Sequence, residues 1–211
     1  MKHWMFAALG LLMIGCNKVA PPQDLATALT PQPQGTTLCS NNLVPSGWVV
    51  TRAYYSGSCG SNFGNNTYTI ENTANLTSLT PVCGAYSFPP SGWVATSIFS
   101  SSGCSSTSSV SNTAYTIQNT AGLSTLSAMC ATVTQPPSGW VVTSVNNFSS
   151  ACSAPNRSPI SYSISNTAKF TSISPVCSSY SMVPSGWTIT SRFTSSGCGS
   201  SLNNAYAIRK L

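Results

Sequence analysis

Eight regularly spaced cysteines constrain this chain more than any other feature of its sequence. They form four successive pairs, and the second member of each pair follows the first after 20, 21, 22 and 21 residues. The first members are 44, 47 and 47 residues apart, so the chain repeats one unit four times. A unit of this size buries too little apolar surface to fold without help, so we expect disulfides to substitute for part of a core. The cysteines are Cys39, Cys59, Cys83, Cys104, Cys130, Cys152, Cys177 and Cys198.

The repeat symmetry reduces the plausible disulfide pairings to two. In the first, each unit closes itself, as in Cys39 with Cys59. In the second, the pairing is shifted, so that Cys59 joins Cys83 and the outermost cysteines, Cys39 and Cys198, close a ring. We favour self-closure, because the last Tyr-x-Ile segment follows Cys198 and completes the fourth unit. Each disulfide then closes a loop whose entropy stabilises the fold by roughly 3 kcal/mol.

Each unit carries a Pro-Ser-Gly-Trp motif followed by an apolar strand pattern. In "WVVTRAY", Trp48, Val50 and Tyr54 alternate with other residues, which predicts a β-strand with these three side chains on one face. In the third unit the aromatic residue, Phe148, comes two positions late, so we expect a bulge there. Pro at the second turn position and Gly at its end would deliver the Trp into the strand.

The four tryptophans are therefore expected to pack beneath their disulfides as structural cores of the units. Stacking of sugar rings on exposed tryptophans is the alternative function for them. A second strand, Tyr-x-Ile, can pack on each Trp, and the segments between units, such as "ENTANLTSLTPV", are candidates for a third strand. The tryptophans are Trp48, Trp93, Trp140 and Trp187, and the second strands begin at Tyr68, Tyr115, Tyr162 and Tyr206.

These patterns predict an all-β fold of four tandem disulfide-stapled repeats of about 45 residues. The arrangement is either a linear array or a closed ring, because "LATALTP" at Leu25 resembles "LTSLTP" at Leu76 and could complement the last unit. The predicted repeats span 39–82, 83–129, 130–176 and 177–211.

The first sixteen residues, "MKHWMFAALGLLMIGC", begin with Lys2 and continue with an apolar run from Trp4 to Ile14. The run is too short to remain as a membrane-spanning helix and is typical of a secretory signal peptide. A Pro-rich segment then precedes the first unit. We expect residues 16–38 to form a semi-extended tether.

The segment Met13 to Cys16 resembles the lipobox of bacterial lipoproteins, although Met13 stands where Leu is usual. The resemblance covers only the N-terminus. It implies removal of residues 1–15, acylation (palmitate and related chains) of Cys16, and stable anchoring to a membrane. Asn17 in place of Asp favours, by the same resemblance, the outer membrane of the bacterial envelope, facing the periplasm or the cell surface. Nine cysteines are present, and assigning Cys16 to lipid leaves eight to pair.

Composition excludes most catalytic chemistry. Charged residues make up 5% of the chain, and the only acids are Asp24 and Glu71, with His3 as the only histidine. Triads, carboxylate pairs and histidine–carboxylate metal sites all need more of these groups than the chain has. The cysteines also lack the close spacing of thiolate metal sites. We therefore expect no enzymatic activity, no cofactor and no metal.

The net charge of +6 comes from scattered lysines and arginines, so nucleic acid is not an expected partner. We expect a non-enzymatic envelope lipoprotein that displays its repeats for adhesion, envelope structure or ligand binding, where repetition adds avidity. Its expected partners are the membrane, through the lipid anchor, and a glycan or protein ligand. The alternative is a carbohydrate-binding or inhibitor module with specificity in variable loops such as "GSNFGNNT" and "SAPNRSPIS".

Overall fold

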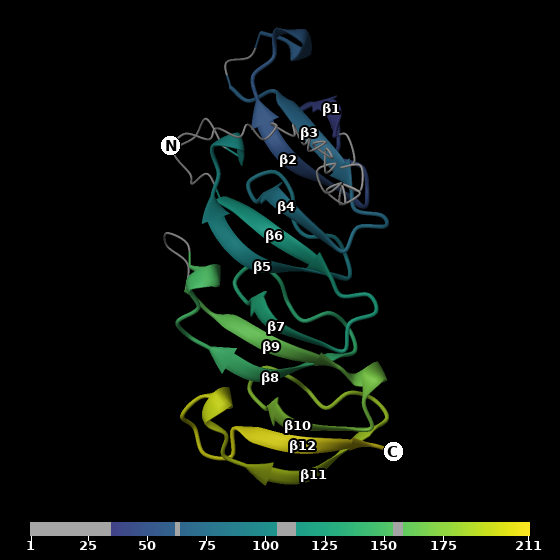
Figure 1. Ribbon diagram of the computed structural model, residues 1–211, viewed down its shortest axis with the longest axis vertical. Coiled ribbons are helices and arrows are strands. Elements are labelled where there is room, and N and C mark those ends of the chain that lie inside the picture. The colour runs from purple at the N-terminus through teal and green to yellow at the C-terminus, as the bar shows by residue number, and fades with distance from the viewer. Residues whose placement is uncertain (1–34, 62–63, 105–112, 154–157) are drawn as a thin grey trace, which may run out of the picture. The chain divides into compact units, whose positions relative to one another are not determined.

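The computed structural model describes residues 35–61, 64–104, 113–153 and 158–211 (Figure 1). It contains four three-stranded antiparallel sheets, and its only helices within these residues are single 3-10 turns. The predicted all-β fold of four tandem repeats is therefore confirmed. In each sheet the Tyr-x-Ile strand lies in the middle, between the strand that ends at the first cysteine and the strand that starts at the Trp (Figure 1).

We number the sheets 1 to 4 in chain order, and all four have the same topology. Sheet 1 contains β1 (Thr36–Cys39), β2 (Trp48–Tyr54) and β3 (Thr67–Asn72) in the order β1-β3-β2. The others are sheet 2 with β4 (Ser78–Cys83), β5 (Trp93–Ser100) and β6 (Thr113–Asn119), sheet 3 with β7 (Thr125–Cys130), β8 (Trp140–Asn146) and β9 (Ser161–Asn166), and sheet 4 with β10 (Ser172–Cys177), β11 (Trp187–Phe193) and β12 (Ala205–Lys210).

The segment between sequence units does form a third strand, and this strand belongs to the sheet of the following unit. In β4, for example, Cys83 pairs with Ala114 of β6. Each sheet therefore begins a few residues before the cysteine that opens the unit in the sequence. The same is true at the start of the described chain, where residues 36–38, which we expected in the tether, form β1 with Cys39.

The Pro-Ser-Gly segment is a tight turn, but its register differs from the prediction. The Trp48 amide donates to the carbonyl oxygen of Pro45 at 3.0 Å, so Pro occupies the first turn position and Gly47, with φ of 78°, the third. Positive φ at the third position is why glycine is needed here. The Thr73 amide and hydroxyl then both donate to the Gly47 carbonyl, at 2.9 and 2.8 Å. Sheets 2 and 3 repeat this contact between Thr120 and Gly92 and between Thr167 and Gly139.

A bulge interrupts every Trp strand, whereas the sequence predicted one only in the third unit. In β2 the pairing register shifts between Val50 and Arg52, and the other three Trp strands shift at the corresponding threonine. The shift places Trp48, Val50 and Ala53 on one face and sends Tyr54 to the other. The predicted face was therefore wrong in its third member. Phe148 lies beyond the end of β8 and is 89% exposed.

Successive sheets are joined through the Trp strand. Strand β2 contacts both β4 and the 3-10 turn η2 (Ser102–Cys104) of sheet 2. Val50 belongs to a buried cluster with Cys83 and Cys104, whereas Val49 clusters with Val82. Burial on both faces explains why the strand carries consecutive valines instead of strict alternation. Strand β5 contacts β7 and η3 (Ser150–Cys152) in the same way, and β8 contacts β10 and η5 (Ser196–Cys198).

A side-chain hydroxyl from the next sheet accepts from one backbone amide at the outer edge of each of these strands. The Val50 amide donates to Ser87 Oγ at 2.9 Å. The same bond joins Ala95 to Thr134 at 3.2 Å and Val142 to Ser181 at 2.7 Å. An edge strand with unpaired backbone groups is a template for aggregation, and each hydroxyl pairs one edge amide that lies against the next sheet.

Candidate functional site

The four disulfides close the units on themselves, as the favoured pairing predicts. They join Cys39 to Cys59, Cys83 to Cys104, Cys130 to Cys152 and Cys177 to Cys198, with Cα–Cα distances of 5.0 to 5.3 Å. Each one connects the end of the first strand to a 3-10 turn that leads into the loop before the Tyr strand. The disulfides therefore anchor the loops that vary between units.

The tryptophans belong to cores, but three of them lie with the disulfide of the following sheet and not with their own. Trp93 is 7% exposed and shares a cluster with Cys130 and Cys152. Trp48 and Trp140 are half-buried against the disulfides of sheets 2 and 4. Trp187, in the last sheet, is 8% exposed and packs within its own sheet. Side chains placed in this way hold consecutive sheets together and offer little surface for stacking a sugar.

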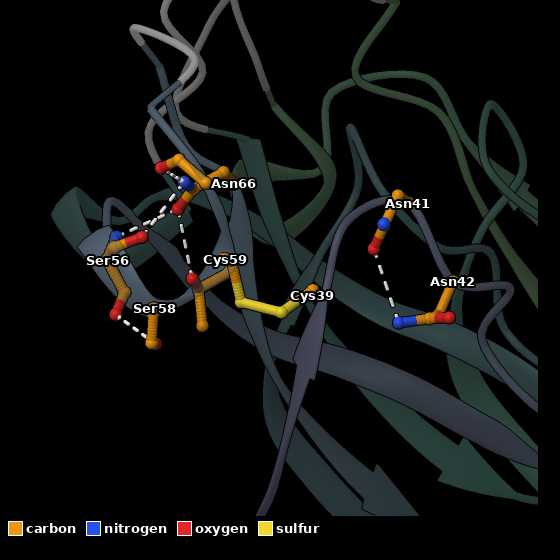
Figure 2. The surroundings of a disulfide bond; sticks show 9 residues. Cys39, Asn41, Asn42, Ser56, Ser58, Cys59 and Asn66 are labelled. Atoms are coloured by element: carbon orange, nitrogen blue, oxygen red, sulfur yellow. Dashed lines mark hydrogen bonds between the residues drawn. A yellow bond between two sulfur atoms is a disulfide. The ribbon is translucent and has the colours of Figure 1, made fainter.

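A buried asparagine braces the variable loop in the first and last units. Asn66 is 5% exposed, accepts a hydrogen bond from the Ser56 amide at 2.8 Å, and donates to the carbonyls of Ser56 and Gly60 (Figure 2). Asn204 makes the same three bonds with Ser195 and Gly199. Figure 2 shows the Asn66 amide beside the turn that carries Cys59, next to its disulfide with Cys39. The positions that correspond in units 2 and 3 hold Thr113 and Ile160.

The sequence analysis placed the candidate binding residues in the loops between the second cysteine and the Tyr strand. Leu202 is an exposed apolar residue of such a loop, whereas the exposed Tyr55 and Phe148 come just before the second cysteine, beside the loops. Tyr55, Phe148 and Leu202 are 53%, 89% and 87% exposed. All three follow a Trp strand and precede a Tyr strand, so each lies at the disulfide end of its sheet. Residues 62–63, 105–112 and 154–157 of the predicted loops lie outside the described residues.

Two hollows lie where sheets 3 and 4 meet. One has a volume of about 370 Å³ and is lined by hydroxyl groups and by Phe170, Ile173 and Pro175. The other, of about 380 Å³, is lined by Gln135, Met182 and the two tyrosines of the junction, together with serines. These two tyrosines, Tyr162 and Tyr180, have ring centroids 5.2 Å apart. Neither hollow has a charged lining residue.

Few ionisable groups in the described residues have a shifted pKa. Burial raises the pKa of Tyr68 and Tyr162, and the neighbouring phenols of Tyr86 and Tyr180 add to the rise. Burial also raises the pKa of Tyr206, against the opposing effect of the Arg192 guanidinium. These raised pKa values keep the phenols neutral at physiological pH, and the Tyr206 hydroxyl donates to the Ser181 carbonyl oxygen. Among the described residues, no three His, Cys, Asp or Glu side chains lie together in a group that could hold a metal.

The sequence analysis did not find the junction hydroxyls Ser87, Thr134 and Ser181. A signal was present, because a hydroxyl residue stands four positions after the first cysteine in three of the four units. The predicted signal peptide and Cys16 lie outside the described residues. In the part of the chain that the structure describes, no helix has the length and apolar character needed to cross a membrane.

Comparison with known proteins finds no match among family models, curated proteins or solved structures.

Proposed function

We propose that the chain is a non-enzymatic lipoprotein of a bacterial envelope that displays variable loops on a repeated β-frame for ligand binding or adhesion. The observation that carries the proposal is the contrast between frame and loops. Four sheets share one topology, one turn, one bulge and one disulfide. The loops between the second cysteine and the Tyr contain 8, 10, 9 and 7 residues and differ in sequence, although those of units 1 and 4 both begin with Gly-Ser and share an Asn-Asn pair. Loops held on a rigid scaffold are where proteins commonly place binding residues.

Anchoring through Cys16 rests on the resemblance of its N-terminus to a lipobox and on the disulfides, which need an oxidising compartment. Replacing Cys16→Ser should move the protein from the membrane fraction to the soluble fraction, with loss of the acyl mass in intact-mass spectrometry. A matched control is Cys39→Ser with Cys59→Ser, which should weaken the fold and leave the acyl mass unchanged. Unaltered membrane retention of the Cys16→Ser protein would contradict the anchor.

Ligand binding by the loops is tested by substitution of their exposed side chains. The full chain, extracted in detergent, is applied to immobilised glycans and to envelope proteins of the source bacterium. Binding should fall in Leu202→Ala, within a loop, and in Tyr55→Ala and Phe148→Ala, beside the loops, and should persist in Ser138→Ala, which changes an exposed residue of a turn at the opposite end of its sheet. Binding that survives all three substitutions at this end of the sheets would place the ligand elsewhere.

Envelope structure is the second candidate function, since repeated sheets can serve as a spacer without any ligand. The exposed Leu202 in a loop, with Tyr55 and Phe148 beside the loops, favours binding, because a spacer gains nothing from large exposed apolar side chains there. A carbohydrate-binding or inhibitor module is the narrower form of the binding proposal. Deletion of the gene distinguishes the structural role from the ligand-binding role. An altered envelope without any loss of ligand capture would favour the structural role.

A further inference from the structure

We propose that the hydroxyl-lined hollow between sheets 3 and 4 binds a neutral sugar residue. Strands β7, β8 and β9 of sheet 3 supply the hydroxyls of Thr125, Thr143 and Ser165, and β10 of sheet 4 supplies those of Ser172 and Ser174. The volume of about 370 Å³ lies in the lower part of the range for small-molecule sites. The inference deepens the ligand-binding part of the proposed function and rests on it, but places the site on the frame instead of the loops.

The chemistry of the lining selects a neutral, hydroxyl-rich ligand. No lining residue is charged, so phosphate, carboxylate or amine groups would find no opposite charge. Ser and Thr hydroxyls both donate and accept hydrogen bonds, which matches the hydroxyls of a sugar. Phe170, Ile173 and Pro175 supply apolar surface against which the C–H face of a sugar ring can pack.

Ser165 adds a polar contact for such a ligand. This residue is 7% exposed and lines the hollow. Within the described residues its hydroxyl makes no hydrogen bond to another protein group, whereas the Thr143 hydroxyl already donates to the Ser163 carbonyl at 3.2 Å. Ser165 lines the hollow and its hydroxyl can both donate and accept, so it is available to a polar ligand that enters.

The other junctions show that the hollow depends on residues particular to this one. The residues that correspond to Ser165 in the strand register are Gln118 in sheet 2 and Glu71 in sheet 1, both of which have longer side chains. Phe170 stands where the preceding units have Leu123 and Leu76. A small residue and an aromatic residue therefore coincide only at the junction of sheets 3 and 4.

Two substitutions test the site with residues that the fold already accommodates at the corresponding positions. The full chain, extracted in detergent, is titrated with methyl glycosides of glucose, galactose, mannose and N-acetylglucosamine, and with their disaccharides, by ligand-observed NMR. At least one should bind, and Ser165→Gln and Phe170→Leu should each weaken binding by about tenfold or more. The control Gln118→Ser changes the corresponding position of another junction and should leave the affinity unchanged. Glucose 6-phosphate and glucuronate should bind no better than glucose.

The outcomes separate this site from the loop-based function. Failure of every sugar to bind, or binding that persists in both Ser165→Gln and Phe170→Leu, would overturn the inference. Sugar binding lost in Phe148→Ala but retained in Ser165→Gln would also overturn it, while leaving the proposed function of the loops in place. Unfolding curves of Ser165→Gln and Phe170→Leu test whether any loss of sugar binding occurs in a folded protein.

Discussion

The junctions between sheets and the two outer faces of the repeat region use the same strands with different side chains. At the junctions, Val49, Val94 and Val141 are at most 1% exposed, whereas the corresponding residue of sheet 4, Thr188, is half-buried. Ile98 of sheet 2 is 4% exposed, but Arg192 stands at its position in sheet 4 and is exposed. Within the described residues no sheet follows β11. Repeat proteins commonly carry polar residues on the outer face of a terminal repeat, so that no large apolar surface is exposed there.

Sheet 1 differs from the junctions in a complementary way. Cys39 and Cys59 are half-buried, whereas Cys83 and Cys104 are 0% exposed because β2 covers them. Leu43, 93% exposed, stands where the other units have the junction hydroxyls. The comparison separates two kinds of residue. The cysteines and the Trp that build each sheet are present in all four units, with Trp187 serving its own sheet, whereas the valine, isoleucine and hydroxyl positions of the junctions change where the junction is absent.

The largest expected effect distinguishes a covered disulfide from an uncovered one. Both Cys83→Ala with Cys104→Ala and Cys39→Ala with Cys59→Ala remove a loop constraint of roughly 3 kcal/mol, since the loops have similar length. The covered pair should cost about 1 to 2 kcal/mol more, because its loss also leaves a cavity at the junction. Unfolding by urea measures both variants. Equal losses would mean that burial by the preceding sheet adds nothing.

The second prediction compares a covered strand face with an open one. Val94→Ala should lower the free energy of unfolding by about 2 kcal/mol, because a fully buried side chain loses apolar contact. Thr188→Ala, at the corresponding position of β11, should change it by about 0.5 kcal/mol or less. Thermal and urea unfolding are the measurements. A comparable loss at Thr188 would show that β11 is covered as well.

The junction hydroxyls provide a third, smaller contrast. Ser181→Ala leaves the Val142 amide without its acceptor and should cost about 1 to 2 kcal/mol. Leu43→Ala, at the corresponding position of unit 1, should have almost no effect on stability, because Leu43 is exposed. Hydrogen exchange at the Val142 amide should also become faster in Ser181→Ala alone. Unchanged exchange would show that another group satisfies this amide.

Local patterns in the sequence predicted the strands, and contacts between units explain what they did not predict. Cysteine spacing predicted the self-closed disulfides, and alternation predicted the Trp and Tyr strands. Alternation cannot reveal which neighbour a strand joins, so β4 was recognised as a candidate strand but not as part of sheet 2. The bulge at Thr51 escaped notice because a polar residue in a strand does not by itself break the pattern.

In the candidate site, too, local sequence features were predictable and features that depend on contacts between units were not. The loops were identifiable because their length varies while the frame repeats. The hollow at sheets 3 and 4 was not, because it requires Ser165 of β9 to meet Phe170 of the segment that leads into β10, and neither residue is unusual at its place in the sequence. A comparison of corresponding positions, Glu71, Gln118 and Ser165, becomes informative only when the structure shows that they face the next sheet.

The smallest expected effect is a change of stability with pH that arises from Glu71, the residue of sheet 1 that corresponds to Gln118 and Ser165. Partial burial raises the pKa of Glu71 above its ordinary value, so the folded protein holds this proton more tightly than the unfolded chain does. Stability should therefore fall as pH rises from the ordinary glutamate pKa through the raised one, and stay lower above it. Glu71→Gln should remove this step and stabilise the protein slightly at neutral pH, with no difference at pH values well below the ordinary pKa. Solvent screens this half-buried group, so the change should be about 0.5 kcal/mol or less.

Gln118→Glu should introduce a similar step in sheet 2, and stability curves measured from acid to neutral pH test both. A step of the opposite sign in the unmodified protein would show that Glu71 gains a favourable partner on folding.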